Sequence, residues 1–150
     1  VSTHAPSRGT AYIETSFRTP VSKQGKYAAA LVFTKAGRDF TRTVSGEECE
    51  TTYNRCVLLA MIRAMQRLNQ PCHLEIYTHN TYIKNMIEQG NPEKWRRSEW
   101  KRSAGGEVQN WERWKLFLEE AEKHEIEMRL KGDEYTETLR AVMEGEEVEA

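Results

Sequence analysis

The feature that most constrains the fold is a change of hydrophobic period near residue 50. Before it, three β-forming runs, "TAYIETSF", "KYAAALVFT" and "FTRTVSG", are separated by the loop segments "TPVSKQG" and "KAGRD". Consecutive strands joined in this way predict an antiparallel meander. After it, apolar residues at helical spacing predict an amphipathic helix over about 50–69, namely Val57, Met61, Ala64, Met65 and Leu68.

The second half of the chain alternates helical and strand patterns. "CHLEIYTH" and "EIEMRLKG" predict a fourth and a fifth strand, and "NTYIKNMIEQG", "VQNWERWKLFLEEAEKH" and "EYTETLRAVM" predict helices, with Asn80 as an N-cap. The segment between the first two of these helices, "NPEKWRRSEWKRSAGGE", is basic and aromatic, and we expect it to be irregular. The order βββαβααβα predicts an α/β fold with a mixed five-stranded sheet and helices on its faces.

The length of the chain favours a single domain. Its near-zero net charge means that any affinity for nucleic acid must come from a local basic patch. The chain has 150 residues and a net charge of −1. We assign residues 1–9 to an irregular N-terminal arm, 10–143 to the domain and 144–150 to an acidic tail. Three cysteines without a CxxC pair, no signal-peptide pattern and no long apolar run favour a cytoplasmic protein without a membrane partner.

Four short sequence segments, in the order in which the family has them, resemble the type I ribonuclease H family over roughly 10–143. "GKYAAALVF" is similar to the family's second strand, "TTYNRCVLLAMIRAM" to its first helix and "IYTHNTYI" to its fourth-strand segment. "WRRSEWKRSAGGEVQNWERW" resembles its basic protrusion, which binds substrate. The resemblance implies cleavage of the RNA strand of an RNA–DNA hybrid by two divalent metal ions, which four carboxylates hold.

The sequence departs from the family at each of those four carboxylate positions. Glu14 stands where the first strand has Asp, Val57 where the first helix has Glu, and His79 where the fourth strand has Asp. "ETLRAVM" is similar to the family's last-helix run and puts Glu137 in the fourth position, without the usual His-bearing loop before it. Mg²⁺ demands near-ideal octahedral oxygen geometry, so we expect two-metal catalysis to be severely impaired and no cofactor to be required.

Two readings of the remaining polar residues stay open. Glu14, His79 and Glu137 are candidate catalytic and metal-binding residues that could hold Zn²⁺ or Mn²⁺; we favour the alternative that His79 only hydrogen-bonds a neighbouring Glu. The alternative of an active nuclease would use Glu14 and Glu137 with Mg²⁺ or Mn²⁺ and could recruit Glu134 or Asp133.

Nucleic-acid contacts are expected at two places. The resemblance implies phosphate contacts for Thr52, Asn54 and Arg55 at the start of the first helix, and the alternative is ordinary N-capping by Thr51 or Thr52. In the basic segment, cationic side chains interleave with tryptophans, as suits a nucleic-acid backbone. These residues are Trp95, Arg96, Arg97, Trp100, Lys101 and Arg102. The alternative is that both tryptophans belong to the core.

Taken with the resemblance, these patterns predict a ribonuclease H-like domain that binds RNA–DNA hybrid or another RNA-containing duplex with little or no cleavage. One alternative is an active hybrid endonuclease. Another is a protein-interaction module that uses the tryptophans. Related domains accompany polymerases, so a larger polypeptide or a polymerase is a further possible partner.

Overall fold

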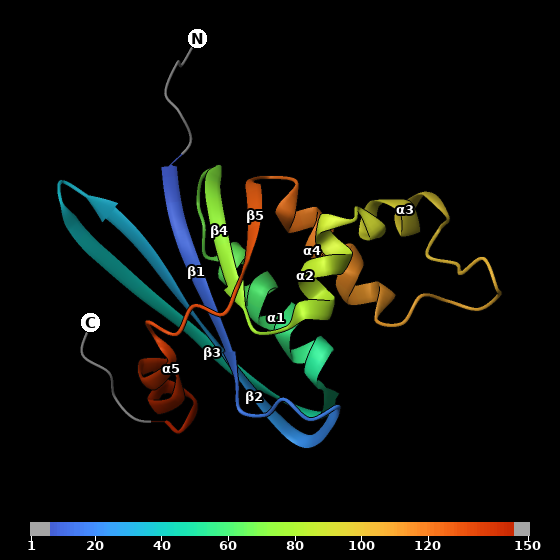
Figure 1. The fold of residues 1–150 in the computed structure, drawn as a ribbon, viewed down its shortest axis with the longest axis horizontal. Helices are drawn as coiled ribbons and strands as arrows, with labels where there is room; N and C mark the ends of the chain where they lie inside the picture. The colour runs from blue at the N-terminus through green and yellow to red at the C-terminus, as the bar shows by residue number, and fades with distance from the viewer. Residues whose placement is uncertain (1–6, 146–150) are drawn as a thin grey trace, which may run out of the picture.

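The computed structural model describes residues 7–145, in which five strands form one mixed sheet of order β3-β2-β1-β4-β5 (Figure 1). Strands β1, β2 and β3 pair antiparallel, whereas β4 lies parallel to β1 and β5 parallel to β4. The predicted sheet is therefore confirmed. The strand bounds are β1 Ser7–Thr15, β2 Val21–Lys35, β3 Arg38–Thr52, β4 Cys72–Thr78 and β5 Glu125–Leu130.

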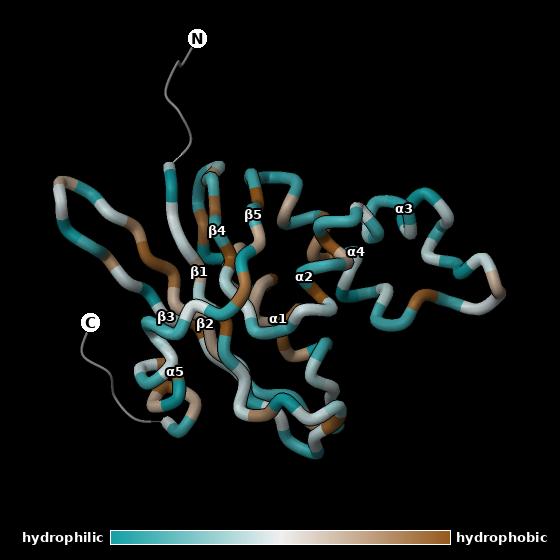
Figure 2. The backbone as a smooth tube through the Cα atoms, in the orientation of Figure 1, coloured by the Kyte–Doolittle hydropathy of each residue, from teal (hydrophilic) through white to brown (hydrophobic). Residues whose placement is uncertain are grey.

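Helices cover both faces of this sheet. The bounds are α1 Tyr53–Gln66, α2 Thr81–Glu88, α3 Asn91–Arg97, α4 Trp111–Ala121 and α5 Thr136–Met143. Alternate residues of β2 show the two sides, because Ala29 and Leu31 join the main core with α1 and α4, whereas Ala28 and Ala30 pack against Leu139 of α5. In Figure 2 the apolar colour concentrates along the strands and the helices that face them.

Two predictions of local structure were wrong. Residues 7–9, which we assigned to an irregular arm, begin β1. Position 9 of this strand requires glycine, because a Cβ there would lie 2.4 Å from the Phe33 ring. The segment expected to be irregular contains α3, with Pro92 in its first turn and Trp95 packed against Trp114 of α4. The observed order is thus βββαβαααβα. Residues 1–6 of the arm and 146–150 of the tail lie outside the described part.

The described part of the chain contains three cysteines and five helices. Cys56 and Cys72 are buried and Cys49 is exposed, and all three are free thiols. Burial raises the pKa of the Cys56 thiol, which packs in the core as expected for a small apolar side chain. Within residues 7–145, no helix is both long and apolar enough to cross a membrane.

Candidate functional site

Parallel pairing of β1 and β4 brings Glu14 and His79 together at one edge of the sheet. Tyr12 and Tyr77 are register partners, and Glu14 and His79 each lie two residues farther along. The carboxyl ends of adjacent parallel strands commonly hold functional side chains in α/β folds. Glu14 is only 6% exposed, so its charge depends on nearby partners for stabilisation.

Three side chains from separate segments converge here. His79 Nε2 lies 3.6 Å from Glu14 Oε1 and 2.9 Å from Asp133 Oδ1. His79 Nε2 is buried, and neither oxygen is aligned with it as a hydrogen-bond acceptor. The prediction that His79 hydrogen-bonds a neighbouring Glu is therefore wrong. Glu14, His79 and Asp133 offer ligand atoms that all lie within 4.8 Å of one another.

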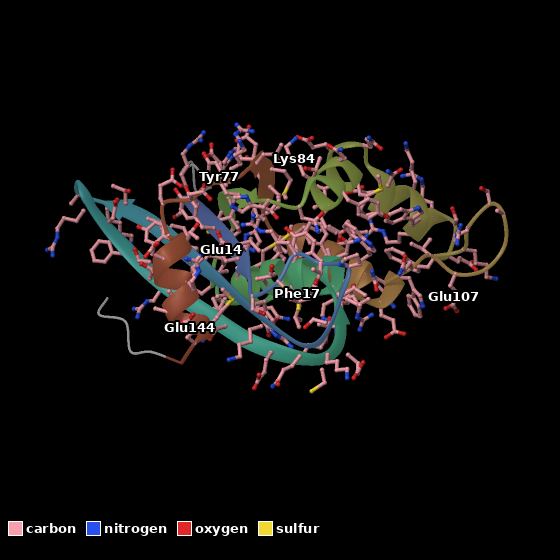
Figure 3. All side chains as sticks on the ribbon, turned by 60° about the horizontal axis from the view of Figure 1, so that its bottom comes forward. Glu14, Phe17, Tyr77, Lys84, Glu107 and Glu144 are labelled. Atoms are coloured by element: carbon pink, nitrogen blue, oxygen red, sulfur yellow. The ribbon has the colours of Figure 1, made fainter. Side chains whose placement is uncertain are left out.

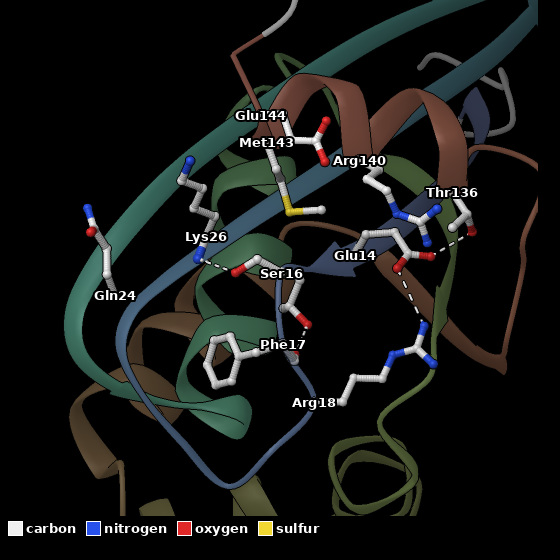
Figure 4. A pocket seen from close by; sticks show the side chains of 11 residues that line it. Glu14, Ser16, Phe17, Arg18, Gln24, Lys26, Thr136, Arg140, Met143 and Glu144 are labelled. Carbon is white, nitrogen blue, oxygen red and sulfur yellow. Dashed lines mark hydrogen bonds and ion pairs between the residues drawn. The ribbon is translucent and has the colours of Figure 1, made fainter.

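Neighbouring polar groups hold the Glu14 carboxylate in place. Thr136 Oγ1 donates a hydrogen bond to Glu14 Oε1 at 2.8 Å, and the Arg18 guanidinium lies 3.5 Å from Oε2 (Figure 4). Arg18 comes from the loop after β1, and Thr136 is the first residue of α5. Oε1 of this carboxylate therefore faces both the Thr136 hydroxyl and the His79 imidazole, whereas Oε2 faces the Arg18 cation.

Glu137 does not join this group. Its side chain is 95% exposed and lies 3.9 Å from Arg140 on the same helix. The first residue of α5, Thr136, already faces Glu14, and Glu137 is rotated away because successive helical residues differ by about 100°. Asp133, which the sequence offered only as a possible recruit, takes its place. Our assignment of Glu137 to the metal-binding group was therefore wrong.

The position of Asp133 follows from a tight turn after β5. Lys131 and Gly132 both adopt left-handed backbone conformations, with φ of 69° and 86°. A Cβ on Gly132 would lie 2.5 Å from Tyr77 Cβ, so this turn also requires close contact with β4. A Gly-Asp pair two residues after the end of a strand was the signal in the sequence that could have identified Asp133.

Val57 gives the site an apolar wall. It is 1% exposed on α1 and, with Glu14 and His79, lines a crevice too narrow to hold a water molecule. Two carboxylates, an imidazole and an aliphatic side chain, with Arg18 alongside, do not match four carboxylates around two Mg²⁺ ions. The residues present therefore do not fit the family's pair of metal ions.

A larger cleft of about 650 Å³ opens beside Glu14, between the β1–β2 loop and α5 (Figure 4). Its cationic lining consists of Arg18, Lys26 and Arg140. Phe17 and Met143 supply apolar surface in the same cleft. Glu14 thus forms a wall between this open cleft and the buried side of the site.

The residues at the start of α1 have partners within the protein. Thr52 is the N-cap and accepts a hydrogen bond from the Arg55 backbone N–H at 3.1 Å, as the capping alternative predicted. Asn54 Oδ1 accepts from Asn80 Nδ2 at 2.8 Å. The Arg55 guanidinium donates to Asn110 Oδ1 at 3.1 Å. Arg55 remains 36% exposed, and phosphate contact by these residues stays a prediction.

Glu48 links α1 to the start of α4. Partial burial acts to raise the pKa of this carboxyl group, but hydrogen bonds from Thr51 and Arg113 and the positive charges of Arg113 and Arg55 lower it overall. Arg55 Nε lies 3.7 Å from Glu48 Oε1, and Arg113 donates to Oε2. The network fixes Arg55 relative to residues 91–110, which we call the basic protrusion.

The basic protrusion places its tryptophans inward and its cations outward. Trp100 is 8% exposed and lies 6.5 Å from Trp111 between ring centroids, so its assignment to the nucleic-acid contacts is wrong and the alternative that it belongs to the core holds. Trp95 is half-buried and contacts Trp114 edge to face at 5.5 Å. All five cationic side chains are exposed: Lys94, Arg96, Arg97, Lys101 and Arg102.

Only one of these cations has an ion pair among the described residues. Arg96 pairs with Glu122 of α4, whereas Arg97, Lys101 and Arg102 have no such partner within residues 7–145. The protrusion extends away from the sheet in Figure 1, and in Figure 3 Glu107 on its loop lies well away from Glu14. Its charge therefore adjoins the sheet as a separate, outward-facing surface.

Comparison with known proteins places this architecture. The family model described as RNase H matches residues 7–131. The chain belongs to the RNase H family. A Ribonuclease H of Caldanaerobacter subterraneus subsp. tengcongensis is 33% identical over 109 residues, covering 72% of this chain and 69% of the relative. One from Acidiphilium cryptum is 38% identical over 103 residues, covering 69% and 61%.

Solved structures agree on the RNase H fold. LC9-RNase H1, described as a type 1 RNase H with the type 2 active-site motif, has a TM-score of 0.77 at 19% identity, covering 97% of this chain and 76% of its own. LC11-RNase H1 in complex with RNA/DNA hybrid has a TM-score of 0.62 at 11% identity, covering 92% and 95%. The family match ends at residue 131, just before Asp133.

Proposed function

We propose that this RNase H domain binds RNA–DNA hybrid and cleaves it little or not at all with Mg²⁺. The observation that carries the proposal is the closed apolar wall of Val57 beside Glu14 and His79, where four carboxylates would be needed. Hybrid binding is supported by LC11-RNase H1, whose structure contains an RNA/DNA hybrid. It is also supported by the outward cations of the basic protrusion.

Binding is expected to be mainly electrostatic at the protrusion. Arg97, Lys101 and Arg102 are exposed and without ion pairs among the described residues, so each can approach a phosphate. Because both tryptophans pack against α4, they position this charged surface rather than contact the bases. Affinity should then be similar for duplexes of different sequence and should fall steeply with salt.

The binding test compares two charge-matched double variants. Arg97→Ala with Arg102→Ala removes two unpaired cations of the protrusion. Arg38→Ala with Arg42→Ala removes the same charge from exposed positions on β3. Titration of a fluorescent hybrid at several salt concentrations should show that only the first pair weakens binding and flattens the log affinity–log salt slope, by roughly one to two. Equal effects of the two pairs would remove the protrusion from the binding surface and favour a protein partner.

The cleavage test uses the same hybrid with Mg²⁺, beside an active RNase H as positive control. We expect no measurable product, and turnover within about tenfold of the active enzyme would overturn this part of the proposal. A second candidate is a hybrid nuclease that uses Glu14 and Asp133, favoured by their proximity to His79. Product formed with Mn²⁺, and lost in Asp133→Asn, would support it.

A larger assembly is a further part of the proposal. The foamy viral protease-reverse transcriptase, solved with RNA/DNA hybrid, has a TM-score of 0.66 at 11% identity, and only 21% of that chain is matched. This neighbour supports a polymerase as a partner or as part of the same polypeptide. Co-purification of this domain with a tagged polymerase from its own source, lost on high-salt washing, would test the partnership.

A further inference from the structure

Two histidines of this chain each lie beside two carboxylates, but with different geometry. At His73, the two ring nitrogens face different carboxylates, with Nδ1 3.0 Å from Glu125 and Nε2 3.3 Å from Glu127. At His79, one nitrogen, Nε2, lies near both Glu14 and Asp133. The first arrangement is a pair of hydrogen bonds across neighbouring strands. The second places ligand atoms of three side chains within 4.8 Å of one another.

Two donor separations at His79 are close to those around a single metal ion. Ligands about 2.1 Å from an ion are separated by roughly 3.0 Å when cis in an octahedron and roughly 3.4 Å in a tetrahedron. The observed separations from His79 Nε2 are 2.9 Å to Asp133 Oδ1 and 3.6 Å to Glu14 Oε1. All three donors lie within 4.8 Å of one another.

The imidazole nitrogen is a second, independent sign of a missing ligand. His79 Nε2 is buried and has no hydrogen-bond partner, although Asp133 Oδ1 lies only 2.9 Å away. Buried polar atoms normally have partners, so an orphan atom in a polar cluster requires an explanation. A cation between the three donors would satisfy the nitrogen and both carboxylates together.

We propose that Glu14, His79 and Asp133 bind one Zn²⁺ ion, in place of the two Mg²⁺ ions that the RNase H resemblance implies. An imidazole with two carboxylates is a donor set that suits Zn²⁺, whereas Mg²⁺ prefers oxygen ligands alone. Val57 closes the side where the family has a further carboxylate, which limits the site to a single ion. The inference concerns the protein without nucleic acid and does not depend on hybrid binding.

Two neighbours would tune this site. Thr136 Oγ1 lies 2.8 Å from Glu14 Oε1 and 3.4 Å from Asp133 Oδ1, so its hydroxyl ties both carboxylates to the start of α5. Outer groups of this kind orient metal ligands and raise affinity by about 10–100-fold. Arg18 acts in the opposite sense, because its positive charge lies 3.5 Å from Glu14 Oε2 and competes with a bound cation.

The experiment is calorimetric titration of the metal-free protein with Zn²⁺ and, separately, Mg²⁺. Co²⁺ serves as a probe whose visible absorption reports the coordination geometry. We expect one Zn²⁺ per chain, with Mg²⁺ binding at least 100-fold weaker. Asp133→Asn and His79→Ala should each abolish binding at the site; Asp133 is 66% exposed, so its replacement tests the site without disturbing the core.

Three further variants sharpen the test. Thr136→Val should weaken Zn²⁺ binding by about tenfold, and Arg18→Gln should strengthen it. His73→Ala, at the other histidine flanked by carboxylates, should leave stoichiometry and affinity unchanged. The proposal is overturned if Zn²⁺ does not bind, if binding survives in Asp133→Asn, or if His73→Ala removes it. Hybrid binding is measured separately, so either result can fail alone.

Discussion

Val57 stands where the RNase H resemblance implies a Glu. Replacing Val57 by Glu tests whether the site can accept a negative charge at this position. Val57 is 1% exposed and lines the same narrow cleft as the buried Glu14. The cleft contains one guanidinium, that of Arg18, which already lies 3.5 Å from Glu14 Oε2. A second carboxylate in this cleft would therefore lack a cation of its own.

The cost of that carboxylate has a calculable ceiling. A buried acid can avoid ionisation by keeping its proton, and at pH 7 this costs at most about 3.7 kcal/mol, taking an unfolded carboxyl pKa of about 4.3. At pH 5 the same ceiling is only about 1 kcal/mol. Val57→Glu should therefore lose stability as pH rises from about 4.3 toward the raised pKa of the new group, by up to about 1.4 kcal/mol per pH unit.

Val57→Gln is the matched control, because it buries a polar side chain of the same shape without a titratable charge. Urea denaturation from pH 4.5 to pH 8 should show the two variants converging in acid and separating by about 2–3.5 kcal/mol at pH 7. Saturating Mn²⁺ should stabilise Val57→Glu more than Val57→Gln, because a ligand that binds only the folded state stabilises it and the added carboxylate strengthens that binding. Equal stability of the two variants at pH 7 would show that position 57 does not face a closed, anionic cleft.

Three further perturbations are checked by urea denaturation across pH. The lowered pKa of Glu48 stabilises the fold above the unfolded carboxyl pKa and is lost as pH falls through the folded value, so Glu48→Gln should be less stable at neutral pH and equal in acid. Burial lowers the pKa of His124, whose Nδ1 accepts the Cys72 backbone N–H, so stability should fall below about pH 6.5, and His124→Gln should remove that fall. Gly132→Ala should cost about 1–3 kcal/mol at all pH values, because it places a Cβ against Tyr77 at positive φ.

The fold was predictable where the pattern of the sequence is local. The strands and most helices carry a period of about 2 or 3.6 that survives in short windows, and turn residues separate them. Helix α3 carries no such period, because its seven residues pack through Trp95 against Trp114 of α4. Trp100 adopts a φ of 64°, which tertiary packing stabilises and no propensity indicates. Both features depend on contacts between distant segments.

The site residues that strands position were predicted correctly. The prediction was wrong for the residue that a turn positions. Glu14 and His79 follow from parallel pairing of two strands, which fixes their register. The choice between Asp133 and Glu137 depends on two consecutive left-handed residues and on which residue starts α5. The resemblance to the family's last helix selects Glu137, which lies on α5. The short connection between β5 and α5 instead brings Asp133 into the site.

Val57 and His79 stand at two positions where the family has acids. With fewer negative charges, the remaining cluster does not need Mg²⁺ to offset repulsion between carboxylates. Four carboxylates in one buried site repel one another and need bound cations to remain charged. Val57 removes one of those charges, and His79 replaces another with a group that carries none or a positive charge. Arg18 and Thr136 then remain as the polar partners of Glu14. Metal-free protein should therefore unfold at nearly the same urea concentration with or without Mg²⁺, whereas Zn²⁺ should raise the midpoint. An Mg²⁺ effect as large as that of Zn²⁺ would contradict this account of the cluster.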